Sequence, residues 1–241
     1  MGLLNLRNAL MAGKRTPTAK DYVQDGLIVM WDSIENVGWG VHDPSDRTWL
    51  DIVGGKTIAL PSATQVLDNK MVFTQAATSS AISYDSDIPA YSVFHTFRML
   101  NQDQASQMIF ILLSYGTSSS VGSYSWNSSI PLRVFRGVNW RNITLEDYDA
   151  PCQIGMVYST KKDGSSPDAI FAIYVNGSQV YKLVGPSWYF AYDFALSGNY
   201  YIGAATNRPQ DVYGIRLYNR AITDAEIAAN YAIDKARFGL P

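Results

Sequence analysis

Hydrolysis of a glycan needs two carboxylates held across one cleft, and this chain offers few side chains for that task. Retaining glycosidases place a nucleophile and a general acid about 5–5.5 Å apart, and alternation along a β-strand sets two such residues on one face. The glutamates are Glu35 in a Gly- and Asn-rich segment, Glu146 within Glu-Asp-Tyr-Asp, and Glu226 at the start of a helical pattern. None belongs to an alternating acidic motif, so we expect a protein that is not an enzyme.

The other groups that often act in catalysis stand alone in the sequence. His42 precedes Asp43, and it either pairs with Asp43, binds a ligand or is a loop residue that bonds the backbone. His95 lies on the apolar face of a strand pattern, as a core histidine would. Neither accompanies a serine in a G-x-S-x-G elbow. Cys152 is the only cysteine, which excludes an intrachain disulfide. Residues 53–57 end like a phosphate loop but lack its earlier glycine, which indicates a turn.

Aromatic residues supply the strongest candidates for a binding site. They make up 13% of the chain, with 16 Tyr and 6 Trp. A flat ring beside polar side chains suits a sugar, because the ring stacks on the sugar face while the polar groups bond its hydroxyls. The candidate ligand-binding residues are Trp39, His42, Asp43, Tyr124, Trp126, Trp140, Trp188 and Tyr192. The alternative is that the rings close the ends of a sandwich as part of its core.

Three groups of acidic residues are candidates for calcium, which takes about six to eight oxygen ligands. They are Asp43, Asp46 and Asp51; Asp85 and Asp87; and Glu146, Asp147 and Asp149. None has the spacing of a known calcium loop, so each is expected to be a solvated loop. We therefore expect no cofactor, with calcium at the first group as the open alternative.

Charge and hydropathy exclude several classes of partner. The formal net charge is −2 and the 19 basic residues are scattered, so nucleic acid is not an expected partner. No stretch approaches the roughly 18 apolar residues of a membrane span, so membrane insertion is not expected. Residues 1–11 lack the pattern of a secretory signal peptide. A chain of this kind that acts outside a cell would leave it by another route.

Short alternating and apolar runs separated by turn signals predict an all-β region from about residue 25 to 219. The expected strands cover residues 26–31, 91–99, 107–113, 132–136, 153–158, 169–175, 178–184 and 200–202. Asn176-Gly177 between two alternating runs is the signature of a two-residue type I′ hairpin, because both turn residues need positive φ. Many short strands without interleaved long helices indicate an antiparallel jelly-roll β-sandwich.

A short helix is predicted over residues 2–12. Leu3, Leu6 and Leu10 form one apolar stripe. So short a helix is marginal in water by itself, and we therefore expect it to contact a partner. The chain is divided accordingly into residues 1–20, a helical anchor and linker, and residues 21–241, a jelly-roll domain with its C-terminal helix.

The predicted C-terminal helix has clear boundaries. Thr223 is a candidate N-cap, and Glu226 stands three residues later, which completes a capping box. Ile222 and Ile227 have the spacing of a hydrophobic staple across this cap. Gly239 follows the last helical residues and is expected to end the helix.

Five short segments carry a family resemblance. They are residues 25–31 (DGLIVMW), 49–54 (WLDIVG), 171–180 (FAIYVNGSQV), 201–203 (YIG) and 214–227 (GIRLYNRAITDAEI). In this order they resemble the strands, the hairpin and the closing segment of laminin G-like domains in the concanavalin A-like lectin/glucanase superfamily. Many members carry an Asp just before the closing segment, where Tyr213 stands here. This departure argues against a family calcium site.

The resemblance implies an antiparallel jelly-roll sandwich and a role in carbohydrate binding. Residues 35–43 and the leader also resemble gut bacterial prophage, phage and surface proteins. Together they imply a non-catalytic carbohydrate-binding or adhesion module on a phage virion or bacterial surface, anchored by its N-terminal segment. The expected partners are a glycan or cell-surface polysaccharide, copies of the same chain in a homo-oligomer, and other virion or surface subunits through residues 1–20. The alternative is a purely structural virion subunit that decorates a capsid or tail, and a glycoside hydrolase is the third interpretation.

Overall fold

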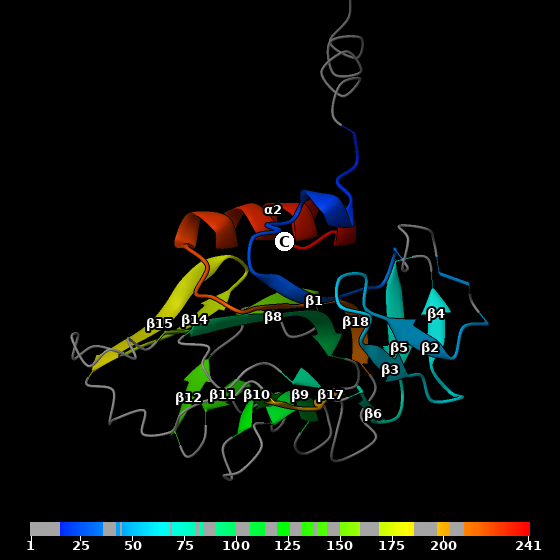
Figure 1. Cartoon of the computed structure of the whole chain (residues 1–241), viewed down its shortest axis with the longest axis horizontal. Coiled ribbons are helices and arrows are strands. Elements are labelled where there is room, and N and C mark those ends of the chain that lie inside the picture. Colours follow the sequence, from blue (N-terminus) through cyan, green and yellow to red (C-terminus); the bar gives the residue numbers. More distant parts are fainter. Residues whose placement is uncertain are drawn as a thin grey trace, which may run out of the picture.

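The computed structural model is an antiparallel β-sandwich with the C-terminal helix α2 packed outside it (Figure 1). It describes residues 15–35, 42–43, 45–67, 69–80, 82–83, 90–99, 107–113, 120–125, 132–136, 139–143, 150–159, 169–185, 197–202 and 210–241. The predicted all-β sandwich with a C-terminal helix is therefore confirmed. The helix expected over residues 2–12 lies outside the described residues.

One sheet has eight strands. Their order is β15 (Ser178–Gly185), β14 (Ala169–Val175), β13 (Cys152–Ser159), β8 (Ala90–Met99), β18 (Gln210–Tyr218), β5 (Lys70–Phe73) and β4 (Gln65–Leu67), with β1 (Leu27–Asp32) also paired to β18. The first part of β18 pairs with β5 and its second part pairs with β1. Two strands from opposite ends of the chain, β1 and β18, thus lie side by side.

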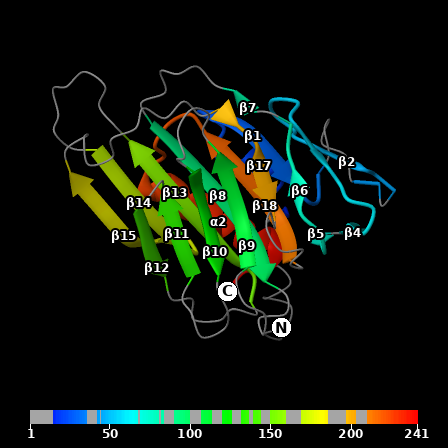
Figure 2. The same cartoon turned by 90° about the horizontal axis from the view of Figure 1, so that it is seen from below.

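A second sheet has six strands and packs against the first. Its order is β12 (Asn139–Ile143), β11 (Leu132–Arg136), β10 (Ser120–Ser125), β9 (Gln107–Leu113), β17 (Tyr200–Ile202) and β6 (Ala77–Thr78). Two further pairs join β2 (Thr48–Leu50) to β3 (Thr57–Ala59) and β7 (Ile82–Ser83) to β16 (Ser197–Gly198). Figure 2 shows the six-stranded sheet lying across one face of the eight-stranded sheet.

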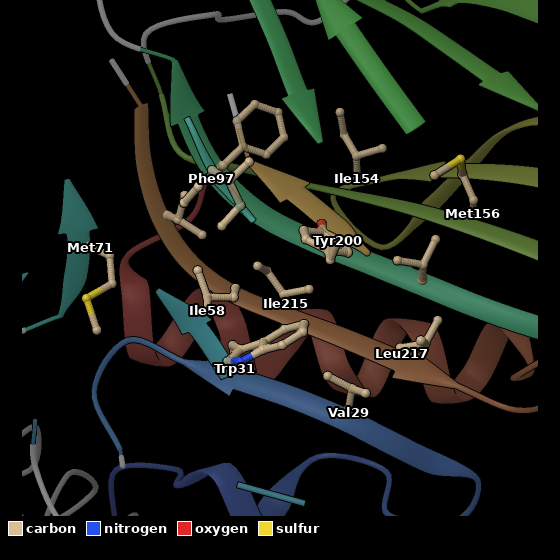
Figure 3. Close-up of a cluster of buried hydrophobic side chains, with 14 of the residues drawn as sticks. Val29, Trp31, Ile58, Met71, Phe97, Ile154, Met156, Tyr200, Ile215 and Leu217 are labelled. Carbon is tan, nitrogen blue, oxygen red and sulfur yellow. The ribbon is translucent and has the colours of Figure 1, made fainter. Parts of the chain in front are cut away.

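The main hydrophobic core fills the space between the two sheets. Trp31, Phe97, Ile154 and Ile215 from the larger sheet are fully buried there, and Tyr200 from the smaller sheet meets them (Figure 3). Burial of each such side chain stabilises the fold by about 1.5–3 kcal/mol. The alternation expected along residues 91–99 is confirmed, since the side chains of the predicted face point into this core.

A second core covers the other face of the eight-stranded sheet. There α2 (Asp224–Phe238) and the short 3₁₀ helix η1 (Ala19–Asp21) pack on the sheet through Phe94, Tyr218 and Ile227. Figure 1 shows α2 and the dark-blue segment that contains η1 together on this side. Every residue of β18 is buried as a result, although alternation by itself would bury only one face.

The boundary expected after residue 20 runs through η1. Ala19 is fully buried in the second core, and its N–H donates to Glu35 Oε1 at 2.7 Å. Thr18 and Asp21 form a capping box at the start of η1. The last residues of the expected linker are therefore packed on the sandwich.

The predicted two-residue hairpin is confirmed. Asn176 and Gly177 have φ of 49° and 75°, and they join β14 to β15 directly after the Val175–Ser178 pair. The Asn176 side chain also accepts a hydrogen bond from Gln153 N–H at 2.9 Å, which ties the turn to the neighbouring strand.

Replacing Gly177 with valine is expected to cost more than about 1 kcal/mol, because a β-branched residue is strained at positive φ. A Cβ at this position would also lie 2.8 Å from Tyr231 Cβ. Urea unfolding of the variant measures the loss. Gly185→Val is the matched control, since a Cβ there meets no atom within 4 Å. Equal midpoints for the two variants would contradict the turn assignment.

The predicted helix cap is also confirmed. Thr223 Oγ1 accepts a hydrogen bond from Glu226 N–H at 3.3 Å, and the Glu226 carboxylate accepts one from Thr223 N–H at 2.7 Å. Ile222 and Ile227 are both buried in the second core, as a hydrophobic staple requires. Gly239 ends the helix with φ of 72°. A hydrogen bond from Arg220 is the main reason why the pKa of Glu226 is lowered to about 2.

Candidate functional site

The backbone of the six-stranded sheet brings two of the predicted binding residues together. Trp140 on β12 pairs with Phe135 on β11, and Tyr124 on β10 pairs with Arg133 on β11. Paired residues share a face of the sheet, and alternate residues along a strand share it too. Phe135 and Arg133 are alternate residues, so Trp140 and Tyr124 occupy register positions of the same face.

Burial at the neighbouring positions identifies this face as the outer one. Ile143 on β12 and Ile202 on β17 are buried in the main core, whereas Asn142 is exposed and Tyr201 is half-buried. Trp140 alternates with Asn142 on β12 and therefore shares its face. The structure describes the backbone at Tyr124 and Trp140, and their side chains lie outside the described residues.

Two polar positions that the sequence analysis did not name belong to the same face. Arg133 pairs with Tyr124 on one side and with Asn142 on the other, so these three residues form one row across the sheet. Trp140 lies two strands and two residues from Tyr124, a separation of about 12 Å between backbones. The alternation in residues 132–136 (LRVFR) is the signal that could have placed Arg133 on the outer face.

His42 lies in a different part of the molecule and is buried. Its Nε2 bonds the carbonyl oxygen of Asp32 at 2.8 Å, and the indole N–H of Trp49 donates to the same oxygen at 3.0 Å. The two rings meet edge to face with centroids 6.5 Å apart. Of the roles considered for His42, the bond to the backbone is present in the structure, and its partner is Asp32 at the end of β1.

Asp43 belongs to a compact polar turn next to His42. Its Oδ1 accepts hydrogen bonds from Ser45 Oγ and Ser45 N–H at 2.6 and 2.7 Å, and these bonds lower the pKa of Asp43. Asp46 Oδ2 accepts from Asp43 N–H at 3.2 Å and lies 3.8 Å from His42 Nδ1. Asp43 is exposed, so one acidic side chain of this turn faces solvent.

The predicted binding residues do not form one site. The loop with His42 and Asp43 precedes β2, and both views place β2 at the opposite end of the sandwich from β12 (Figures 1 and 2). Four more predicted residues lie outside the described part of the chain: Trp39, Trp126, Trp188 and Tyr192. The outer face of the six-stranded sheet is therefore the place where predicted residues come together.

Two of the glutamates have structural partners. Glu35 accepts hydrogen bonds from Arg237 and from Ala19 N–H, and Glu226 belongs to the helix cap. Glu146 lies outside the described residues. The catalytic pair that a retaining glycosidase needs is thus not formed by Glu35 and Glu226, which have separate roles.

His95 and Cys152 are buried in the sandwich. Desolvation lowers the pKa of His95 to about 3, and its Nδ1 bonds the hydroxyl of Tyr200 at 2.6 Å. Desolvation also raises the pKa of the Cys152 thiol to about 12, so this thiol is a poor nucleophile near neutral pH. The imidazole of His95 and the thiol of Cys152 are therefore both buried inside the fold.

Asp51, the third acidic residue of the best calcium candidate, has a structural role. Its carboxylate accepts hydrogen bonds from the backbone N–H groups of Met30, Val53, Gly54 and Lys56, at 2.5–3.3 Å. These bonds hold the turn between β2 and β3, where the sequence predicted a turn. Within the described ranges, no group of three or more His, Cys, Asp or Glu side chains is arranged to hold a metal ion. The described helices include none with the length and apolar character of a bilayer span.

The sequence matches no family model and no curated protein. Solved structures with the same fold do match. A Trypanosoma rangeli sialidase in complex with 2,3-difluoro-KDN has a TM-score of 0.65 at 12% identity, over 96% of this chain and 38% of that chain. The receptor-binding domain of botulinum neurotoxin D has a TM-score of 0.62 at 10% identity, over 86% of this chain and 52% of that chain.

A third similar structure comes from botulinum neurotoxin type C, whose cell entry is described as dependent upon interaction with two ganglioside molecules. Its TM-score is 0.59 at 9% identity, over 88% of this chain and 51% of that chain. The chain therefore spans about a third of the sialidases and about half of the neurotoxin chains that it matches. At these identities the likeness shows the β-sandwich fold alone.

Proposed function

We propose that this chain is a non-catalytic carbohydrate-binding module of the laminin G-like type. The observation that carries the proposal is the register of the six-stranded sheet, which sets Trp140 and Tyr124 on one outer face with Arg133 and Asn142. Aromatic and hydrogen-bonding residues on one surface are the combination that a sugar needs. The fold is shared with a neurotoxin type whose cell entry depends on gangliosides, which supports a glycan as the ligand.

We propose binding rather than catalysis because the two glutamates that the structure describes, Glu35 and Glu226, are held in structural contacts. Glu35 is engaged by Arg237 and Glu226 by the cap of α2, so neither is placed to act on a bond in a sugar. A retaining glycosidase would need two carboxylates about 5–5.5 Å apart beside the ligand. Among the similar structures the sialidases are enzymes, but this chain spans only about a third of their length.

The proposed setting is a phage virion or a bacterial surface, with the N-terminal segment as the anchor. The segment that contains η1 packs beside α2, on the side of the eight-stranded sheet that faces away from the six-stranded sheet (Figure 1). An anchor attached there leaves the outer face of the six-stranded sheet directed away from the attachment point. This arrangement suits a module that is held at one side and binds at the other.

Replacing Trp140 or Tyr124 with alanine is expected to weaken glycan binding by about tenfold or more, since aromatic anchors dominate such interfaces. A glycan array with host-surface polysaccharides identifies the ligand, and calorimetry then measures the affinity of each variant. Leu67→Ala, which truncates an exposed side chain on the other sheet, serves as the control and should bind like the unmodified chain. Absence of binding to every glycan would refute the lectin role and favour a purely structural subunit.

A further inference from the structure

Residue pairing links one outer position on every strand of the six-stranded sheet. Phe135 pairs with Trp140 on one side and with Gly122 on the other. Gly122 pairs in turn with Ile111, which pairs with Tyr201. Paired residues lie on the same face of a sheet, so all these positions belong to the outer face that holds Trp140. They form an outer row that crosses the strands seen side by side in Figure 2, from β12 to β6: Trp140, Phe135, Gly122, Ile111, Tyr201 and Thr78.

Aromatic positions stand at two distant places in the outer row. Trp140 and Tyr201 are four strand spacings apart, which at about 4.8 Å each places their backbones about 19 Å from each other. Tyr201 is half-buried, so part of this residue is open to solvent. One sugar unit is about as long as one strand spacing, roughly 5 Å. A ligand that contacts both aromatic positions must therefore be a chain of sugars.

Gly122 lies at the centre of the outer row, two strands from Trp140 and two strands from Tyr201. A glycine has no side chain, so the sheet presents only its backbone at this position. Glycine weakens the interior of a strand, and one reason for its presence there is the close approach of a ligand to the backbone. The outer row thus has an aromatic position on each side of a place without a side chain.

On the basis of the proposed carbohydrate-binding role, we infer that the ligand is an internal stretch of a linear polysaccharide, about four sugar units long, that crosses the strands along the outer row. Trp140 and Tyr201 contact the two ends of this stretch, and Gly122 lets its middle approach the backbone. Tyr124 and Arg133, which pair with each other in the neighbouring row, are positioned beside the sugar chain. Such a site selects for the length of a glycan rather than for its terminal sugar.

The test measures how the affinity of the full chain depends on the length of the glycan. The probes are the polysaccharide that binds on the glycan array and the disaccharide and hexasaccharide prepared from it. Calorimetry is expected to show that the hexasaccharide binds at least about tenfold more tightly than the disaccharide, because only the longer probe reaches both aromatic positions. Equal affinities for the two would overturn the inference and leave the proposed function in place. Absence of binding to every glycan would refute both.

Gly122→Val tests the place without a side chain. Valine is favoured in β-strands, so the melting temperature is expected to stay equal or to rise. The added side chain should at the same time weaken hexasaccharide binding by about tenfold or more, because it occupies the centre of the outer row. Gly185→Val is the matched control, since a Cβ on β15 there meets no atom within 4 Å, and it should bind like the unmodified chain.

Tyr201→Ala tests the far end of the outer row. This variant is expected to lower the affinity for the hexasaccharide to about that of the disaccharide. The inference is overturned if either Gly122→Val or Tyr201→Ala binds the hexasaccharide like the unmodified chain. A lower melting temperature for Gly122→Val would also overturn it, because a neighbouring side chain rather than a ligand would then fill the space above the glycine.

Discussion

Replacing Asp234 with alanine is expected to lower the free energy of unfolding by about 3–5 kcal/mol, the usual loss when one partner of a buried ion pair is removed. The guanidinium of Arg216 donates two hydrogen bonds to the Asp234 carboxylate, each of 2.6 Å, and both side chains are buried. Alanine would leave the Arg216 charge between β18 and α2 without this carboxylate.

The loss is expected to be large because Asp234 also joins three other parts of the fold to α2. Its carboxylate accepts hydrogen bonds from Tyr22 in the N-terminal segment at 2.5 Å, from Thr96 on β8 at 2.7 Å, and from Gln153 on β13 at 2.7 Å. The Arg216 guanidinium in turn lies 4.2 Å from the centre of the Tyr22 ring. One carboxylate thus holds the helix, the sheet and the N-terminal segment together.

Urea unfolding monitored by circular dichroism measures this effect. Asp25→Ala, which removes a carboxylate that is 85% exposed, is the control and should change stability by no more than about 0.5 kcal/mol. A double variant, Asp234→Leu with Arg216→Met, is expected to recover much of the loss, because it leaves no buried charge without a partner. Equal losses in Asp234→Ala and in the control would show that the pair does not hold α2.

The same pair predicts how stability depends on pH. Burial by itself raises the pKa of Asp234, but the Arg216 charge and the hydrogen bonds outweigh burial, so the pKa is lowered. A carboxyl with a lowered pKa in the folded state contributes its full stability above the unfolded value of about 3.9. That contribution is lost as the pH falls from there toward the folded value. The double variant should therefore lose less stability in acid than the unmodified chain.

Deletion of residues 1–23 is expected to lower the melting temperature by about 10 °C, whereas deletion of residues 1–14 should leave it nearly unchanged. The longer deletion removes Ala19 and Tyr22, which are buried in the second core. Loss of one large buried aromatic side chain costs about 3–5 kcal/mol, and in a chain of this size each kcal/mol corresponds to about 2–4 °C. Differential scanning calorimetry of the two shortened chains makes the comparison.

The two deletions also separate the roles of the N-terminal segment. If residues before Arg15 form the proposed anchor, the chain without residues 1–14 should stay folded and lose its assembly with a partner or with itself, as measured by light scattering. A large drop in melting temperature for this shorter deletion would show that the leader stabilises the sandwich. An unchanged melting temperature for the longer deletion would contradict the role of Tyr22.

Local structure could be predicted from the sequence where neighbouring residues decide it. The turn at Asn176 and Gly177 and the cap formed by Thr223 and Glu226 are both present as expected. Each depends on positive φ or on hydrogen bonds over three residues, so the chemistry is contained within a few positions. The alternation in β8 was predictable for the same reason, because its period is set by the strand itself.

The second core could not be predicted from such patterns. The bond between Tyr22 and Asp234 joins residues 212 positions apart, and the pair of Arg237 with Asp32 joins residues 205 positions apart. Nothing in either neighbourhood shows that α2 will cover the sheet and bury both faces of β8 and β18. Hydrogen bonds of this kind form only when packing has brought the elements together and excluded water.

For the candidate site, too, some features could be predicted from the sequence and others depend on the tertiary structure. The sequence by itself determined that Tyr124 and Trp140 are aromatic residues in polar surroundings and that His42 stands beside acidic residues. Only the tertiary structure decided that Tyr124 and Trp140 share a face with Arg133 and that His42 instead contacts Asp32 of β1 and Trp49 of β2. The physical reason is strand register, since a shift by one residue would move every side chain to the opposite face, and register is set by pairing between distant segments.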